Sequence, residues 1–232
     1  MPRIEGHRAG IDSVREVTTE CARMGVKSLT LYAFSVENWK RPQTEVRFLM
    51  SLLRLFLVRE RRTLMENAVR LSCIGRLAEL PVAALRELRR TEELTAANDG
   101  MLLRLALSYG SRAEIADGLR AFAEDVRAGR MTPNAVDEET LRRYLYDPKT
   151  PDPDLVIRTA GEQRISNFLL WQISYSELFV TEVCWPEFRR PELLAALAAY
   201  ARRKRKYGGL TPGSEAATPK ELAPKHLGKG KR

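Results

Sequence analysis

The chain has 232 residues, of which 44% are hydrophobic and 30% charged, a composition typical of a globular protein that folds in water. No uncharged apolar run approaches the roughly 18 residues that a membrane-spanning helix needs, and the first residues lack a signal-peptide pattern, so we expect a cytoplasmic protein. The three cysteines form no CxxC pair, which argues against a disulfide framework or a zinc site.

The net charge of +9 is concentrated at the C-terminus. Residues 201–232 hold ten Lys and Arg and two Glu, a net +8, which leaves +1 for residues 1–200. No aromatic residues interleave with the distal lysines, so nucleic-acid binding is not expected. We predict one domain over residues 1–209 and a basic, disordered tail over 210–232 that acidic lipids would attract, which adds membrane association to the expected location.

Apolar periodicity and turn residues predict alternating helices and strands. Helices are expected over residues 6–24, 43–68, 81–99, 112–129, 138–145 and 190–206, and strands over 27–34, 69–75, 101–110, 154–159 and 177–183. Strands that are separated by crossover helices form a mostly parallel sheet with helices on both faces. The expected fold class is therefore α/β. The helix over 43–68 carries an unusually broad apolar surface between Val46 and Leu57.

Two of the predicted strands run into polar loops. SVENWKR follows the strand over 27–34, and TAGEQRISNF follows the segment DLVIR. In α/β sheets, ligands gather beyond the carboxyl ends of the strands. Arg41, Arg158 and Arg164 offer forked donors that match phosphate oxygens, and Gly161 lets backbone N–H groups approach the same anion. The loops predict a shared pyrophosphate site, and the alternative is that the arginines pair with nearby glutamates and only brace the loops.

Several other classes of chemistry lack support in the sequence. It contains neither GxxxxGK[ST] nor GxGxxG after a strand, the signatures of nucleotide hydrolysis and dinucleotide binding. His7 and His226 are its two histidines, so no convincing Ser-His-acid triad can be assembled. Paired acids of the DDxxD type, which mark the all-helical prenyl transferases, are also missing from the sequence.

Four segments resemble, in this order, the bacterial cis-prenyl transferases, also called isoprenyl transferases or undecaprenyl diphosphate synthases: GHRAG, LTLYAFSVENWKRP, DLVIRTAGEQRISNFLLWQ and YSELFVTEVCWPEF. The resemblance implies an enzyme that condenses isopentenyl diphosphate onto an allylic diphosphate, typically farnesyl diphosphate, in cis geometry with Mg2+. It also implies a hydrophobic tunnel for the growing polyprenyl diphosphate, with the helix over 43–68 as one wall. A homodimer is a further implication.

The resemblance assigns roles to individual positions. Asn38 corresponds to the asparagine proposed to accept a proton or to orient the condensation, and Glu177 to a magnesium ligand. The isopentenyl diphosphate site corresponds to Arg158, Arg164, Ile165 and Ser166. The allylic diphosphate and the adjacent reaction centre correspond to Arg3, His7, Trp39 and Arg41, with Ser35, Val36 and Glu37 in the same loop.

Some of these positions have a plainer reading. His7 could be a helix-start residue bonded to a loop carbonyl, and Trp39 could pack beneath its loop. Glu177, expected to end a strand opposite the arginines, could be the ion-pair partner of one of them. Asn38 is a weak base, so the expelled diphosphate could take the proton while the amide positions it.

The N-terminal region departs from the family pattern. Family members carry a first strand and a loop resembling MDGNGRWA, whose aspartate coordinates magnesium, whereas this sequence begins MPRIEGHRAG. Magnesium usually needs one or two carboxylates together with substrate phosphates and waters, so Glu177 alone is a poor site. We therefore expect the natural chain to begin earlier, and the present chain to bind diphosphates weakly and to condense nothing. The alternative function is a non-catalytic binding subunit of a prenyl transferase pair.

Overall fold

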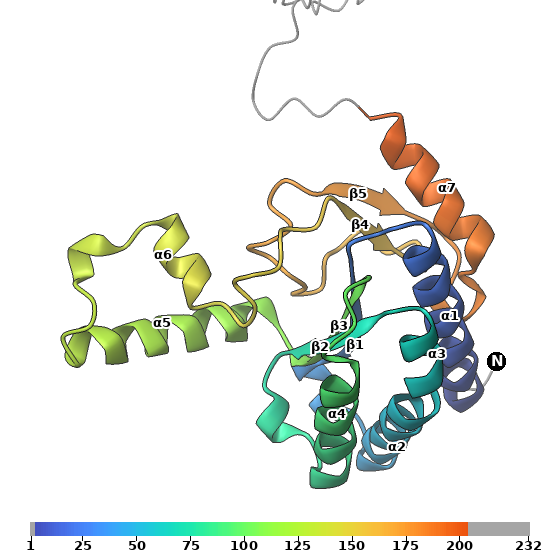
Figure 1. Cartoon of the computed structure of the whole chain (residues 1–232), viewed down its shortest axis with the longest axis horizontal. Helices are drawn as coiled ribbons and strands as arrows, with labels where there is room; N and C mark the ends of the chain where they lie inside the picture. Colours follow the sequence, from blue (N-terminus) through green and yellow to red (C-terminus); the bar gives the residue numbers. More distant parts are fainter. Residues whose placement is uncertain (1–2, 204–232) are drawn as a thin grey trace, which may run out of the picture. The chain divides into compact units, whose positions relative to one another are not determined.

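The structure is a computed structural model that describes residues 3–203, with side chains from residue 9 onward. Residues up to Ala201 form one compact unit, and the tail predicted for 210–232 lies outside the described residues. The helices are α1 Arg3–Arg23, α2 Gln43–Arg59, α3 Arg61–Glu66, α4 Val82–Thr95, α5 Ser111–Arg127, α6 Glu138–Arg143 and α7 Arg190–Ala201 (Figure 1). The strands are β1 Ser28–Ser35, β2 Arg70–Ile74, β3 Leu102–Tyr109, β4 Leu155–Arg158 and β5 Glu177–Val180. Within the described part of the chain, no helix is long and apolar enough to cross a membrane.

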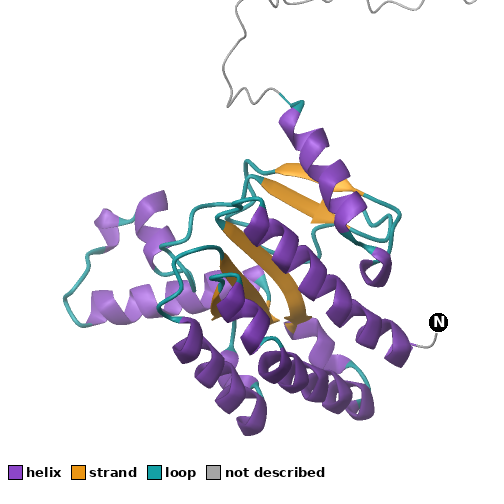
Figure 2. Cartoon of the chain, turned by 45° about the vertical axis from the view of Figure 1, so that its right-hand side comes forward, coloured by secondary structure: helices purple, strands orange, loops and turns teal. Residues whose placement is uncertain are grey.

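All strand pairs are parallel, which confirms the predicted α/β class, but the strands form two sheets. In one sheet β3 lies between β1 and β2, and in the other β4 pairs with β5. Helices pack beside the three-stranded sheet, and α7 packs against β5 (Figure 2). Between residues 3 and 203, no strand pairs with the second edge of β1 or of β4.

The hydrogen bonds between the strands determine which backbone groups face these two free edges. The N–H of Leu102 donates to the carbonyl of Lys27, so alternate residues of β1 point toward β3. Ser28, Thr30 and Tyr32 therefore direct their backbone N–H and C=O groups away from β3. In the same way the N–H of Thr181 donates to Arg158, so the backbone groups at positions 155 and 157 point away from β5.

The helix predicted over 43–68 is interrupted at Glu60, where α2 ends and α3 begins. Glu60 is only 2% exposed and accepts two hydrogen bonds from Arg15, at 2.9 and 2.5 Å. A buried carboxylate needs such a partner, because an unpaired charge in the interior is costly. The apolar pattern runs through the break, since Leu57 and Leu64 are both buried, and for this reason periodicity alone did not reveal it.

The main core lies between α1, α2, α4 and the three-stranded sheet. β3 is buried along almost its whole length, as expected for a central parallel strand. Leu57, Leu88 and Leu103 are fully inaccessible to solvent. Each such leucine contributes about 1.5–3 kcal/mol through burial, so this core fixes the position of β1 and of the loop that follows it.

A polar cluster joins α5 to the loops after β2 and α6. Asp117 accepts a forked pair of hydrogen bonds from Arg76, at 2.9 and 3.0 Å, and one from the Tyr146 hydroxyl at 2.6 Å. Arg120 also donates to it, at 2.8 Å. The hydrogen bonds from Arg76 are the main cause that lowers the pKa of Asp117 well below its usual range, against the opposing effect of burial.

Asp117→Asn is expected to lower the free energy of unfolding by about 1–3 kcal/mol at pH 7, because the amide cannot accept the guanidinium fork. The folded-state pKa of Asp117 is depressed, so its stabilising contribution is present above the unfolded pKa of about 3.9 and is lost as the pH falls toward the lower folded pKa. Urea unfolding of both proteins at pH 7 and pH 3 should show the difference narrowing in acid. A difference that is equal at the two pH values would contradict this account.

Candidate active site

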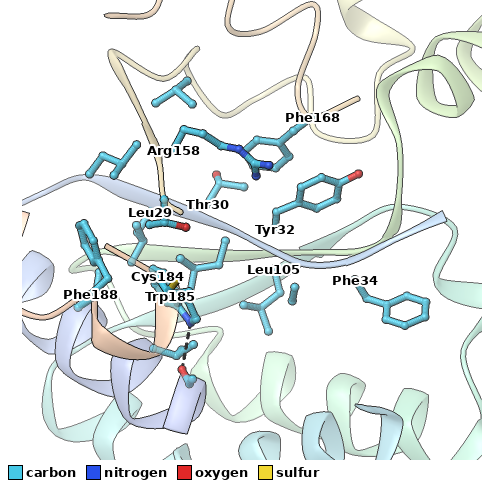
Figure 3. Close-up of a pocket in the computed structure, with 18 of the residues that line it drawn as sticks. Leu29, Thr30, Tyr32, Phe34, Leu105, Arg158, Phe168, Cys184, Trp185 and Phe188 are labelled. Atoms are coloured by element: carbon cyan, nitrogen blue, oxygen red, sulfur yellow. Dashed lines mark hydrogen bonds between the residues drawn. The ribbon is translucent and has the colours of Figure 1, made fainter. Parts of the chain in front are cut away.

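A cavity of about 1250 Å³ lies against both sheets (Figure 3). Its lining includes every residue from 28 to 34 of β1 and from 155 to 158 of β4. Alternate residues of a strand point to opposite faces, so consecutive residues line one cavity only where the edge of the strand faces it. The cavity is therefore the space that the free edges of β1 and β4 border. Most of its remaining walls are apolar, from α1, α2, β3 and the segment around Trp185: Ile11, Val14, Val17, Leu49, Met50, Leu52, Leu53, Phe56, Leu105, Leu107 and Phe188.

The three arginines singled out in the sequence all line this cavity. Arg41 donates to Glu45 at 2.8 Å, and Arg164 forms a close ion pair with Glu162. Arg158 differs from both, because its buried Nε has no hydrogen-bond partner among the described residues and its Nη2 reaches only Ser166 Oγ, at 3.5 Å. Figure 3 shows its side chain extending toward Phe168. Buried donors are nearly always satisfied, so an unpartnered one at a cavity indicates an acceptor that comes from outside the protein.

The other residues predicted around SVENWKR lie in η1, a 3-10 helix over Val36–Lys40, and most serve its structure. Asn38 Oδ1 accepts a hydrogen bond from the N–H of Ser35 at 3.1 Å. Trp39 donates to Ser108 Oγ at 2.8 Å and meets the Phe34 ring edge-on, which favours the packing alternative. These contacts shape the loop, whereas Arg41 is the residue of this loop that lines the large cavity.

The remaining predicted positions divide between the cavity and its surroundings. Ile165 lines the cavity next to Arg164. Ser166 is exposed, and its contacts are long: its Oγ lies 3.5 Å from Arg158 Nη2, and its carbonyl accepts from the Tyr32 hydroxyl at 3.4 Å. Val36 and Glu37 lie in η1 outside the cavity lining. Arg3 and His7 fall in the first turns of α1, but their side chains lie outside those that the structure describes.

Glu177 does not lie opposite the arginines. It begins β5, as the strand predicted over 177–183 does, and it pairs with Leu155, whereas Arg158 pairs with Val180 at the other end of the two strands. Three residues of strand separate the two ends by about 10 Å. No group of three or more potential metal ligands occurs in the described residues. Magnesium remains a prediction from the family resemblance.

Two further residues hold the site together and were not predicted. Tyr32 of β1 donates to the carbonyl of Tyr109 at 3.1 Å and stacks on Phe168, with ring centroids 4.6 Å apart. Burial, with a smaller effect of Glu37, raises its pKa to about 12, so it remains a neutral donor. Asn167 bonds to both α5 and η1. A hydroxyl inside an otherwise apolar strand and an amide beside the arginines were the signals present in the sequence.

Comparisons with known proteins agree with this geometry. The family described as "Putative undecaprenyl diphosphate synthase" matches residues 1–208. A trans,polycis-polyprenyl diphosphate synthase ((2Z,6E)-farnesyl diphosphate specific) from Thermobifida fusca is 49% identical over 212 residues, which are 91% of this chain and 75% of that protein. The lavandulyl diphosphate synthase of Lavandula x intermedia, solved with dimethylallyl diphosphate, superposes with a TM-score of 0.86 at 36% identity, over 88% of this chain and 89% of that one. A probable undecaprenyl diphosphate synthase from Campylobacter jejuni superposes with a TM-score of 0.76 at 33% identity, over 87% of this chain and 92% of that one. The chain therefore belongs to the undecaprenyl diphosphate synthase family of prenyl transferases, which extend prenyl chains in cis geometry.

Proposed function

We propose that this protein condenses isopentenyl diphosphate onto farnesyl diphosphate and builds a long-chain polyprenyl diphosphate. The observation that carries the proposal is that Arg41, Arg158 and Arg164 line the same cavity as the apolar face of α2. A ligand with an anionic head and a hydrocarbon tail matches both kinds of wall. The Thermobifida fusca relative is named as specific for (2Z,6E)-farnesyl diphosphate, which supports farnesyl diphosphate as the starter.

Arg41, which the family resemblance places at the allylic diphosphate, would act on the leaving group. In this reaction the C–O bond of the allylic diphosphate breaks, the alkene of isopentenyl diphosphate forms a new C–C bond, and a proton is lost. Negative charge grows on the departing diphosphate, and forked guanidinium donors stabilise it without any proton transfer. Arg158, whose buried Nε has no partner in the described part of the protein, would instead bind the diphosphate of isopentenyl diphosphate, which is not released in this step.

The apolar walls would protect the allylic cation. Leu49, Leu53 and Phe56 of α2 and Leu105 and Leu107 of β3 face the cavity. Such walls exclude water, which would otherwise capture the cation, and they align the two substrates for attack. The volume of the cavity also leaves room for a hydrocarbon chain that lengthens at each cycle.

Other parts of the proposal rest on the family resemblance. We propose that Asn38 orients the condensation, since Ser35 already occupies its carbonyl oxygen. Magnesium would have to be held by carboxylates additional to Glu177, because Glu177 lies at the far end of β5 from Arg158. A homodimer, a cytoplasmic location and contact of the basic tail with membranes belong to the same proposal.

The proposal is tested by incorporation of radiolabelled isopentenyl diphosphate in the presence of farnesyl diphosphate and magnesium. Two proteins are compared, the chain of 232 residues and the same chain extended at its N-terminus by the corresponding segment of the Thermobifida fusca relative. We expect the extended protein to make long polyprenyl products and the shorter one to bind substrate with little turnover. A reaction that lacks farnesyl diphosphate is the control.

The position of Glu177 at the far end of β5 from Arg158 favours one alternative, a non-catalytic binding subunit. It predicts that neither protein incorporates label although both bind isopentenyl diphosphate. That result would overturn the enzyme proposal. Full activity of the shorter protein would instead show that no additional carboxylate is needed.

A further inference from the structure

The first turn of α5 is capped from a distant part of the chain. Its N-cap residue is Gly110, which has no side chain to bond the free N–H groups of the helix. Asn167 bonds them instead. Its backbone carbonyl accepts from the N–H of Ser111 at 2.9 Å, and its Oδ1 accepts from the N–H of Arg112 at 3.0 Å.

Gly110 leaves the space that Asn167 occupies. A Cβ at position 110 would lie 2.6 Å from Asn167 Nδ2 and 2.8 Å from Cγ2 of Val36. These distances are well inside van der Waals contact, so any other residue at this position would push the amide or η1 away. The close approach therefore depends on glycine, and it brings α5, η1 and Asn167 together.

The third bond of Asn167 reaches the loop after β1. Its Nδ2 donates to Glu37 Oε1 at 2.9 Å. Partial burial raises the pKa of Glu37, but the hydrogen bond from Asn167 and smaller contributions lower it more, so the net pKa is below the usual range. Glu37 is thus an ionised acceptor, and a hydrogen bond to a charged acceptor is among the stronger kinds.

The loop that carries Asn167, here called the arginine loop and comprising residues 159–170, has a strained backbone. Ser166, Asn167 and Leu169 have φ values of 50°, 62° and 46°. Asparagine tolerates this left-handed region, but for other residues it costs about 1–2 kcal/mol each. Such a conformation persists only where the surroundings hold it. The N–H of Leu170, which donates to Ser111 Oγ at 2.7 Å, adds a further tie to α5.

We propose that Asn167 is the positioning residue that locks the arginine loop onto η1 and α5, and so holds Arg164 and Ile165 of this loop at the cavity. Its two acceptor atoms fix the loop to the start of α5, and its amide nitrogen fixes it to the loop that carries Arg41. The two arginine-bearing segments are thereby held in one arrangement before any ligand binds. The consequence for diphosphate binding rests on the proposed function, whereas the locking of the loop does not.

Asn167→Asp separates the two roles of this side chain, which accepts a hydrogen bond from α5 and donates one to η1. The carboxylate can still accept from the N–H of Arg112, but it cannot donate to Glu37 and it places a second negative charge beside it. We expect hydrogen exchange of the amides of residues 160–170 in the full, ligand-free chain to become at least about 10-fold faster, because the bond that is lost is charge-assisted. The dissociation constant for isopentenyl diphosphate, measured by calorimetry, should rise by at least about 10-fold as well.

In the double variant Asn167→Asp with Glu37→Gln, the amide introduced at position 37 can donate to the carboxylate introduced at position 167. The hydrogen bond is thereby restored with its direction reversed. Glu37→Gln alone completes the double-mutant cycle. We expect the double variant to return both readouts to within about threefold of the unsubstituted protein. A merely structural role for Asn167 would not be rescued in this way.

Asn98→Asp is the matched control. Asn98 Nδ2 donates to the carbonyl of Val69 at 2.8 Å, and neither residue lines the cavity. This change should lower overall stability without faster exchange in the arginine loop. Unchanged exchange in Asn167→Asp, an equal effect of Asn98→Asp on the loop, or no recovery in the double variant would each overturn the proposal. If the unsubstituted protein does not bind isopentenyl diphosphate, the proposed function fails, and the exchange comparison still decides the role of Asn167.

Discussion

Arg158→Lys is expected to weaken the binding of isopentenyl diphosphate by about 10- to 100-fold, although the charge is kept. Arg158 is the cavity arginine whose buried Nε has no partner among the described residues, so it has a donor available for a phosphate oxygen. Lysine replaces the planar fork with a single ammonium group and cannot reproduce two parallel hydrogen bonds. Calorimetric titration of both proteins with isopentenyl diphosphate measures the difference.

Arg62→Lys provides the control for this comparison. Arg62 has a side chain that is 85% exposed, and it pairs with Glu66 one helical turn away on α3. Exposed pairs of this kind contribute little, so the dissociation constant should not change. If Arg158→Lys binds isopentenyl diphosphate as tightly as the unsubstituted protein, Arg158 is not a forked ligand of the diphosphate.

Glu114→Ala is expected to lower the free energy of unfolding by about 3–5 kcal/mol. Glu114 of α5 is 1% exposed and accepts hydrogen bonds from the Tyr109 hydroxyl at 2.5 Å, the N–H of Tyr146 at 3.1 Å and Gln172 Nε2 at 3.1 Å. Alanine would leave these donors buried without an acceptor and would open a cavity beneath them. Urea unfolding, monitored by tryptophan fluorescence, measures the loss.

Glu124→Ala on the same helix is the matched change at an exposed position. It should alter the free energy of unfolding by no more than about 0.5 kcal/mol. A loss below about 1 kcal/mol for Glu114→Ala would mean that water or another group satisfies the three donors, contrary to the cost expected for buried unpaired groups.

The apolar pattern of each segment was sufficient to predict most of the helices and strands. The apolar runs at 27–34 and 101–110 became β1 and β3, and the alternation with helices gave the parallel pairing. The break in the helix over 43–68 was missed because the apolar pattern runs through it, and the ion pair that Glu60 forms at this point reaches Arg15, which is 45 residues away. A single sequence shows the periodicity of one segment, but not the charge that a second segment brings to it.

The same limit applies to the site. The positions of Arg41, Arg158 and Arg164 at one cavity agree with the rule that ligands gather at strand ends. Glu177 was expected opposite the arginines, but it lies at the other end of the strand pair from Arg158, because the register in which β5 pairs with β4 cannot be read from either segment alone. Asn167 was missed because it caps a helix that begins more than fifty residues earlier.

The division of the strands into two sheets determines where the cavity wall can yield. β4 and β5 share no backbone ladder with the other three strands, so on this side of the described protein no inter-strand hydrogen bonds join the free edges of β1 and β4 that border the cavity. It can widen there without the loss of any inter-strand hydrogen bond. Conversely, an extended segment that paired with the free edges of both β1 and β4 would find backbone donors and acceptors on each side. It would join the two sheets into one and make this side of the cavity rigid.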